Sequence, residues 1–215
     1  MLALDHIVIN SSNTNDIITH SGMKVAIKAV KGGEHDEWGT YNYLSHFSNN
    51  SYLELLGVND YEKARNSTNP LIQHLLYMQE QEINGPFQFA LRTKQLDSYV
   101  THFDKEGIPY KGPFAAQREK PDGTILKWRM LFPVYDYKQE TLPFLIEWED
   151  PKSVFSEANL ANTQSITRVN YGSLDKQTFA RIYQMKPKKL NKNQLTLLNS
   201  TIYFTQNGKI NFELV

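Results

Sequence analysis

The chain has 215 residues, and its 23 basic side chains balance its 23 acidic ones, so the formal net charge is zero. It contains no cysteine, which excludes disulfides, thiolate metal sites and cysteine nucleophiles. No apolar run approaches the ~20 residues of a membrane helix. The first ten residues lack a basic segment and include Asp5 and His6, which is typical of a strand rather than a signal peptide. We therefore expect a cytoplasmic protein of one or two globular units that does not bind membranes.

The charges are unevenly distributed along the chain. Residues 1–150 carry 14 Lys and Arg against 20 Asp and Glu, whereas residues 151–215 carry 9 against 3. This distribution favours two regions that attract each other, either within one chain or across a homodimer. The basic stretch Met185–Asn193 has no interleaved aromatic residues, so nucleic-acid binding is not expected.

In chain order, the first predicted element is a strand over Leu2–Asn10. Strict alternation along this strand puts His6 on one face and Asp5 on the other. The elements that follow are a short helix capped at Asn13 or Thr14 and ending at Gly22, a strand Met23–Val30, a polar loop Lys31–Thr40, and a hairpin of two strands, Tyr41–Phe47 and Ser51–Val58.

A helical linker then separates this unit from a second one of the same pattern. Asn69 is a predicted helix cap, and Pro70 occupies the first helical position. The second unit is predicted as a strand Pro86–Thr93, a helix Lys94–Lys105 closed by Gly107, and three strands, Lys111–Arg118, Thr124–Phe132 and Phe144–Glu149.

The last 65 residues predict about half of a third unit. A strand over Ser165–Asn170 is followed by a helix that is capped at Ser173 or Asp175 and runs through Tyr183. The turn residues Gln206-Asn207-Gly208 then predict a hairpin between the strands Thr201–Thr205 and Lys209–Val215.

Two strands each contain a glutamate among apolar residues. Glu54 lies in Ser51–Val58 and Glu147 lies in Pro143–Asp150. A carboxylate is costly to bury unless a cation or hydrogen-bond donors meet it. The recurrence of a glutamate within an apolar strand predicts a duplicated unit whose two carboxylates converge on one pocket.

These segments, in this order, resemble the vicinal oxygen chelate superfamily, which includes glyoxalase I, extradiol dioxygenases and bleomycin-resistance proteins. Within it they are most similar to the glyoxalase-like domain family. The resemblance rests on LDHIVI, HDEWGTYNYL, SYLELLGV, PDGTILKWRM and PFLIEWED, which together cover roughly residues 3–150. It implies an α+β fold in which two β-α-β-β-β modules form a cupped mixed sheet. The modules would be residues 1–58 and 86–150, joined by a helical linker 59–85 and followed by a C-terminal half-module 151–215.

In that superfamily a metal ion sits in the cup, held by the first and last strand of each module. Carried over, these positions are His6, Glu54, Phe89 or its neighbour Gln88, and Glu147. His6, Glu54 and Glu147 would suit Mn²⁺, Fe²⁺, Ni²⁺ or Zn²⁺. The implied activity is that of an isomerase, lyase or dioxygenase on a small oxygenated molecule, with Glu147 moving a proton.

The residues also allow a metal-free interpretation. His6 would then be a core histidine, and the glutamates would pair with Arg92, Arg118 or Arg129. The protein would bind or sequester a small molecule, as bleomycin-resistance proteins do.

His35 lies in the polar loop and could be a fourth ligand, a general base or a substrate contact, or it could be an exposed loop residue. Asn42, Trp128 and Arg129 are the predicted substrate-binding residues. For Arg129, the alternative to a substrate carboxylate is an ion pair with one of the glutamates.

Overall fold

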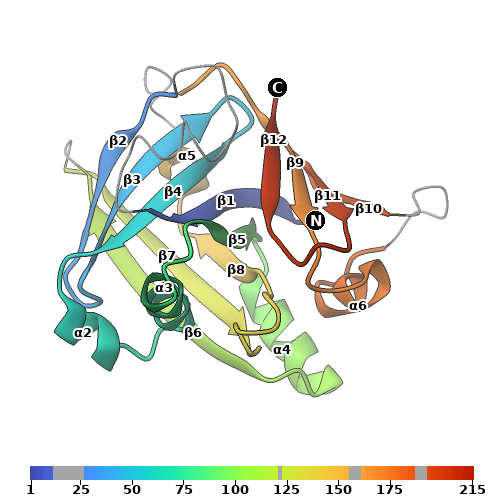
Figure 1. The fold of residues 1–215 in the computed structure, drawn as a ribbon. Coiled ribbons are helices and arrows are strands. Elements are labelled where there is room, and N and C mark those ends of the chain that lie inside the picture. The colour runs from blue at the N-terminus through green and yellow to red at the C-terminus, as the bar shows by residue number, and fades with distance from the viewer. Residues whose placement is uncertain (12–26, 121–122, 155–160, 187–192) are drawn as a thin grey trace.

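A curled eight-stranded mixed sheet forms the centre of this computed structural model, which describes residues 1–11, 27–120, 123–154, 161–186 and 193–215 (Figure 1). Its strands are β1 (Ala3–Asn10), β2 (Val30–His35), β3 (Thr40–Phe47), β4 (Ser51–Val58), β5 (Gly85–Arg92), β6 (Tyr110–Glu119), β7 (Ile125–Pro133) and β8 (Phe144–Trp148). Their order across the sheet is β2-β3-β4-β1-β5-β8-β7-β6. The sheet curls into a half-barrel, with β2 and β6 at its two edges.

The two halves of this order repeat one pattern. In each half the first strand pairs in parallel with the last, β1 with β4 and β5 with β8, and the remaining pairings are antiparallel. The halves join through the antiparallel pair β1–β5. The predicted α+β fold with two repeated modules in one cupped sheet is therefore confirmed. The predicted helix that ends at Gly22 lies outside the described residues, as does most of the predicted strand Met23–Val30.

The predicted polar loop Lys31–Thr40 is largely wrong, because β2 occupies its first half. β2 is an edge strand and pairs only with β3. Edge strands carry charged and small residues that are rare in central strands, so their sequences resemble loops. Its pairing with β3 also shifts register between Lys31 and Gly33, which leaves Gly32 as the extra residue of a bulge.

Two helices of the linker lie against the concave face of the half-barrel, α2 (Tyr61–Asn66) and α3 (Pro70–Glu80) (Figure 1). α3 begins as predicted, with the Asn69 side chain accepting from the amide of Leu71 and proline in the first turn. It buries Ile72 and Leu75 in an inner core shared with the sheet. The inner core is therefore closed at one end by this helix.

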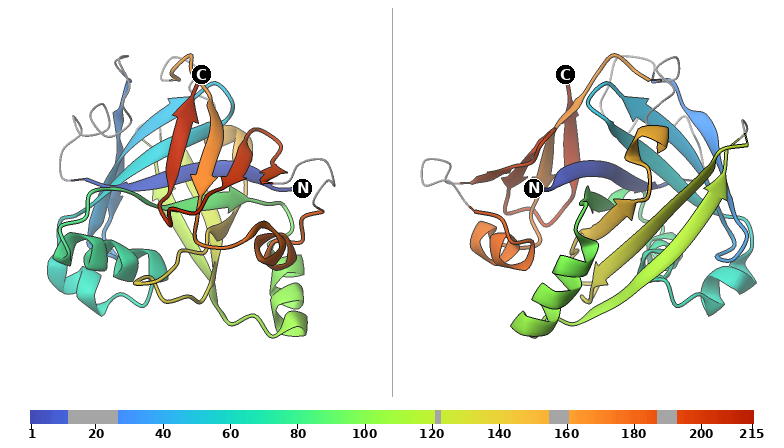
Figure 2. Two further views of the ribbon diagram at one scale, coloured as in Figure 1. Left: turned by 45° about the vertical axis from the view of Figure 1, so that its right-hand side comes forward. Right: turned by 180° about the vertical axis from the view of Figure 1, so that it is seen from behind.

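The convex face of the half-barrel is covered by the helices α4 (Leu96–Glu106) and α6 (Lys176–Ile182) and by a second sheet (Figure 2). α4 ends at Gly107, whose φ of +64° suits glycine. The Tyr99 hydroxyl on α4 donates to the carbonyl of Tyr183, whose own hydroxyl donates to the carbonyl of Pro143. The apolar residues that pack between the half-barrel and these elements form one continuous outer core, which includes Leu53 of β4 and Tyr171 of the C-terminal part. The domain division at residue 150 stays a prediction.

The second sheet has the order β10-β11-β9-β12. Its strands are β9 (Ile166–Tyr171), β10 (Gln194–Thr196), β11 (Thr201–Phe204) and β12 (Asn211–Leu214), and a short helix α5 (Pro151–Val154) precedes them. The predicted C-terminal hairpin is wrong, because β9 lies between β11 and β12 and pairs with both. The turn is present, but it carries the chain across the end of β9, where the Thr205 amide donates to the carbonyl of Tyr171.

Candidate functional site

A bulge in β1 determines which side chains enter the cup. The pairing of β1 with β5 shifts register between Leu4 and His6, so Asp5 is an extra residue in the ladder. A bulge interrupts the alternation of side chains. Asp5 and His6 consequently lie on the same side of the strand and bond to each other, and the predicted placement of Asp5 on the opposite face is wrong.

Four polar side chains form a connected, buried group at the bottom of the cup, which we call the polar network. Asp5 Oδ1 lies 2.7 Å from His6 Nδ1, and His6 Nε2 lies 3.4 Å from Glu54 Oε2 on the neighbouring parallel strand. The Asn42 amide then donates to Glu54 Oε1 over 2.6 Å. All four residues are buried. Buried charges are found in proteins when partners of this kind compensate them.

Asp5 is further held by two donors from the second module. Arg92 Nη1 and Trp148 Nε1 both lie 3.0 Å from Asp5 Oδ2. Every described contact of this carboxylate is thus with a donor, which fixes the carboxylate and, through it, the His6 ring. The role of Asp5 was not predicted, although an Asp-His pair inside an apolar strand is itself a signal that the two polar groups need partners.

The charges of the polar network shift the pKa values of its ionisable residues. Burial disfavours the charged form of His6, but the hydrogen bond to Asp5 and the nearby Glu54 carboxylate outweigh it and raise the pKa of the imidazole to about 9. Burial likewise opposes ionisation of Glu54, and the nearby His6 imidazolium nevertheless lowers the pKa of this carboxyl to about 2. Burial also disfavours the ionised form of Asp5, but the hydrogen bond from His6 and the charges of His6 and Arg92 outweigh it and lower the pKa of this carboxyl. At neutral pH the site is therefore an imidazolium between two carboxylates.

The cavity above the polar network is small and has aromatic walls. Its volume is about 50 Å³. The Tyr52 ring stacks on the His6 ring at 4.5 Å between centroids, and Phe144 meets the same ring edge-on at 5.5 Å. Ile72 of α3 and Ile146 of β8 complete this part of the wall.

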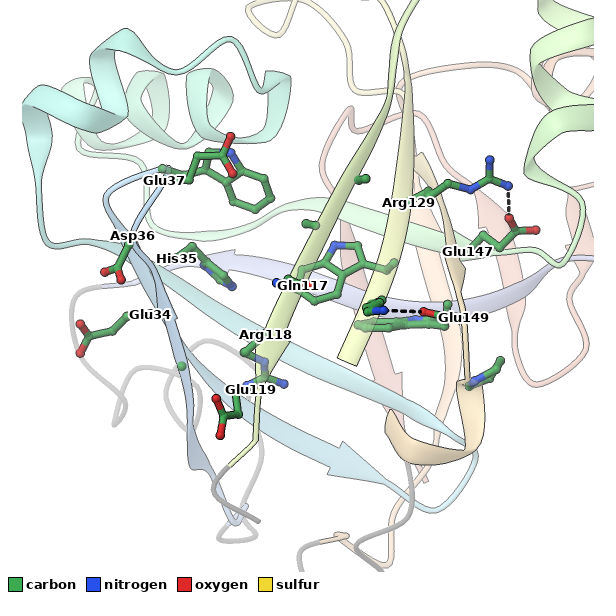
Figure 3. Close-up of a pocket in the computed structure, with 18 of the residues that line it drawn as sticks. Glu34, His35, Asp36, Glu37, Gln117, Arg118, Glu119, Arg129, Glu147 and Glu149 are labelled. Atoms are coloured by element: carbon green, nitrogen blue, oxygen red, sulfur yellow. Dashed lines mark hydrogen bonds and ion pairs between the residues drawn. The ribbon is translucent and has the colours of Figure 1, made fainter. Parts of the chain in front are cut away.

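The small cavity adjoins a wider cleft of about 1220 Å³ between the edge strands (Figure 3). Five residues line both spaces and so form the passage between them: His35, Trp38, Arg118, Trp128 and Trp148. The chain contains three tryptophans, and all of them belong to this passage.

Arg118 crosses the gap between the two edge strands. Its side chain reaches from β6 and donates to the carbonyl of Gly32 on β2. The absence of a side chain at Gly33 makes this possible, because a Cβ there would lie 2.7 Å from Arg118 Cδ. Because Arg118 lines both spaces, this bond lies at the mouth of the small cavity.

Glu147 does not join Glu54. Its neighbours Ile146 and Trp148 line the small cavity, whereas Glu147 itself accepts from the amide of Leu96 at the start of α4 and from Arg129. Figure 3 shows Arg129 and Glu147 together on the side of β7 that faces α4. The predicted convergence of the two carboxylates is therefore wrong, because successive residues of a strand point to opposite faces.

Arg129 is likewise absent from the small cavity. It pairs with Glu147 and with Asp97, which is the ion-pair alternative considered for it. Asn42 and Trp128 do line the small cavity. Their substrate-binding role, and that of Arg129, stay predictions.

His35 ends β2 and points toward the passage from the edge opposite Arg118 (Figure 3). Its Nδ1 lies 3.1 Å from Thr40 Oγ1, and its ring lies 5.6 Å from that of Trp38. Burial lowers the pKa of this imidazole, so a neutral ring is favoured at pH 7. His35 is thus a candidate ligand contact rather than a plain surface residue.

The side chains of the cup do not fit a chelated metal ion. Within the described ranges, no three His, Asp or Glu side chains are grouped so that they could hold one. The cross-strand neighbours of His6 in the second module are Ala90 and then Phe144, neither of which is a ligand. Gln88, the other predicted ligand position, uses its amide to bind Tyr135 and the carbonyl of Leu142. The predicted set of His6, Glu54 and Glu147 is not assembled.

The family described as "Glyoxalase-like domain" matches residues 4–186, which spans the domain boundary expected at residue 150. A search of curated proteins finds no match. Among the described helices, none has the length and apolar composition needed to cross a membrane.

Among solved structures, the chain is similar to a hypothetical protein from Staphylococcus aureus, with 22% identity, 96% of this chain and 87% of that chain covered, and a TM-score of 0.74. This likeness shows the fold. A methylmalonyl-CoA epimerase from Mycobacterium tuberculosis is 16% identical and covers 71% of this chain and 91% of its own, with a TM-score of 0.47.

Proposed function

We propose that this chain, which belongs to the glyoxalase-like domain family of the vicinal oxygen chelate superfamily, binds a small molecule in the cup of its half-barrel without a chelated metal ion. The observation that carries this proposal is the polar network of Asp5, His6, Glu54 and Asn42 at the bottom of an aromatic cavity. The carboxylates of Asp5 and Glu54 both face the His6 ring, and the second module supplies walls in place of further ligands. A homodimer and a cytoplasmic location stay predictions.

The shape of the site suits a flat, partly apolar ligand. Small-molecule sites are concave, mostly apolar, and contain a few fixed polar groups that set orientation. Here the wide cleft and its tryptophans offer the apolar surface, and the small cavity offers one enclosed polar end. A ligand would therefore place its body among Trp38, Trp128 and Trp148 and direct one polar group toward His6 and Glu54.

A second candidate is a metal-dependent isomerase, lyase or dioxygenase. The specific observation in its favour is that His6 and Glu54 face each other from adjacent parallel strands at 3.4 Å. This function requires at least one more protein ligand near them, and the described residues place none there. Calorimetric titration of the protein with Mn²⁺, Fe²⁺, Ni²⁺ and Zn²⁺, repeated on His6→Ala, tests it.

The proposal itself is tested by tryptophan fluorescence. Because all three tryptophans lie at the passage, a ligand bound there changes the emission, and binding elsewhere leaves it largely unchanged. We expect a screen of small aromatic molecules to give saturable changes in emission, with no effect of a chelator. Saturable metal binding that is lost in His6→Ala would overturn the proposal in favour of the metalloenzyme.

A further inference from the structure

The small cavity presents one hydrogen-bond donor beside one acceptor. His6 Nδ1 is used by Asp5 and Glu54 Oε1 by Asn42, at 2.7 and 2.6 Å. His6 Nε2 and Glu54 Oε2 remain, 3.4 Å apart. A charge-assisted hydrogen bond between such groups normally measures about 2.7–2.9 Å, so this contact is long. Both atoms therefore keep capacity for a ligand.

The direction of each bond follows from the neighbours. Both ring nitrogens of His6 face carboxylate oxygens, and these contacts are favourable when both nitrogens carry hydrogen. An ionised Glu54 only accepts. The cavity thus offers an N–H from His6 and a lone pair from Glu54 on adjacent positions.

The room available limits the group that can use them. A bound water needs roughly 10–15 Å³ measured in this way. The cavity of about 50 Å³ therefore holds roughly three or four atoms of a ligand. This is the size of a carboxamide, whose carbonyl and N–H lie side by side.

We propose that the small cavity recognises a neutral carboxamide-type group, with its carbonyl accepting from His6 and its N–H donating to Glu54, at the end of a flat apolar body that lies among the tryptophans. This inference rests on the proposed binding function. A carboxylate on the ligand would bring a second negative charge against Glu54 Oε2. A ketone would leave Glu54 without its new donor, and a hydrocarbon would leave both atoms without partners.

Three probes of nearly equal shape separate these cases: benzamide, benzoate and acetophenone. Their binding to the whole protein can be followed by ¹⁵N–¹H NMR of the three indole groups, one of which, Trp148, donates to Asp5. We expect benzamide to bind about ten- to hundredfold more tightly than either other probe, which is the range for one buried hydrogen bond to a charged group. Glu54→Gln, which keeps the shape of the side chain but not its charge, should reduce the preference over benzoate.

The outcomes distinguish the inference from the function on which it rests. If all three probes shift the indole signals with equal affinity, the cup binds small molecules but the carboxamide preference is wrong. Tighter binding of benzoate would also overturn the preference and would assign the selection to Arg118 at the mouth. If no probe perturbs the indoles, the binding proposal fails as well. Since the comparison is made on the wild type, it does not depend on Glu54→Gln folding.

Discussion

Raising the pH from 6.5 to 9 should destabilise the protein through His6. The pKa of this imidazole is raised from 6.5 to about 9 in the folded protein, so the folded state keeps a proton that the unfolded state releases across this interval. Stability is then fully present below pH 6.5 and falls as the pH rises toward 9. At 1.36 kcal/mol per pKa unit, the loss in the free energy of unfolding is about 3 kcal/mol.

Urea unfolding, followed by circular dichroism at intervals between pH 6 and pH 9.5, measures this loss. His6→Gln is the matched control, because a glutamine does not titrate and should show a nearly flat profile over the same interval. A wild type whose stability is flat, or whose decrease is the same in His6→Gln, would refute the ion pair between His6 and its two carboxylates. Stability that instead rises with pH and falls with a chelator would indicate a metal ion on a neutral His6.

Three further predictions follow from single contacts. Asp5→Asn leaves a buried imidazolium and Arg92 short of a charge partner, and urea unfolding should show a loss of about 3–5 kcal/mol. Burial lowers the pKa of His74 to about 4, so wild-type stability should fall by about 3 kcal/mol as the pH drops from 6.5 to 4, and unfolding of His74→Gln should lack this slope. Gly33→Ala places a Cβ 2.7 Å from Arg118 Cδ and should displace that side chain, which would be detected as faster quenching of tryptophan fluorescence by acrylamide.

Local signals in the sequence were enough to predict most of the fold. Asn69-Pro70 and Gly107 mark the ends of helices through backbone requirements that hold in any context, and both act as expected. The edge strand β2 and the C-terminal hairpin were mispredicted because their structure depends on long-range pairing. β9 inserts between β11 and β12, and no local pattern in Gln206–Gly208 reports on a strand that ends 35 residues earlier in the chain.

The site was harder to predict than the fold for a related reason. Glu54 was singled out correctly as a buried carboxylate that needs partners, and it has them in His6 and Asn42. Glu147 carries the same sequence signal, but its partners are Arg129 and the first turn of α4 on the other face of the sheet. An apolar run around a glutamate shows that the strand is buried on both faces, and it cannot show which face the glutamate takes.

The bulge in β1 explains why the two modules share a fold but differ in chemistry. One extra residue in the ladder brings Asp5 to the same side as His6, and it thereby gives the first module a fixed and charged imidazole. Across the sheet from His6, the second module carries Ala90 and Phe144, which cannot bind a proton or an ion. Its polar contributions are the Arg92 guanidinium and the indole N–H of Trp148, which together hold Asp5 in place. The polar network is therefore complete only when the two modules pair through β1 and β5. Ligand binding in the cup and the stability of the β1–β5 pairing should consequently be coupled.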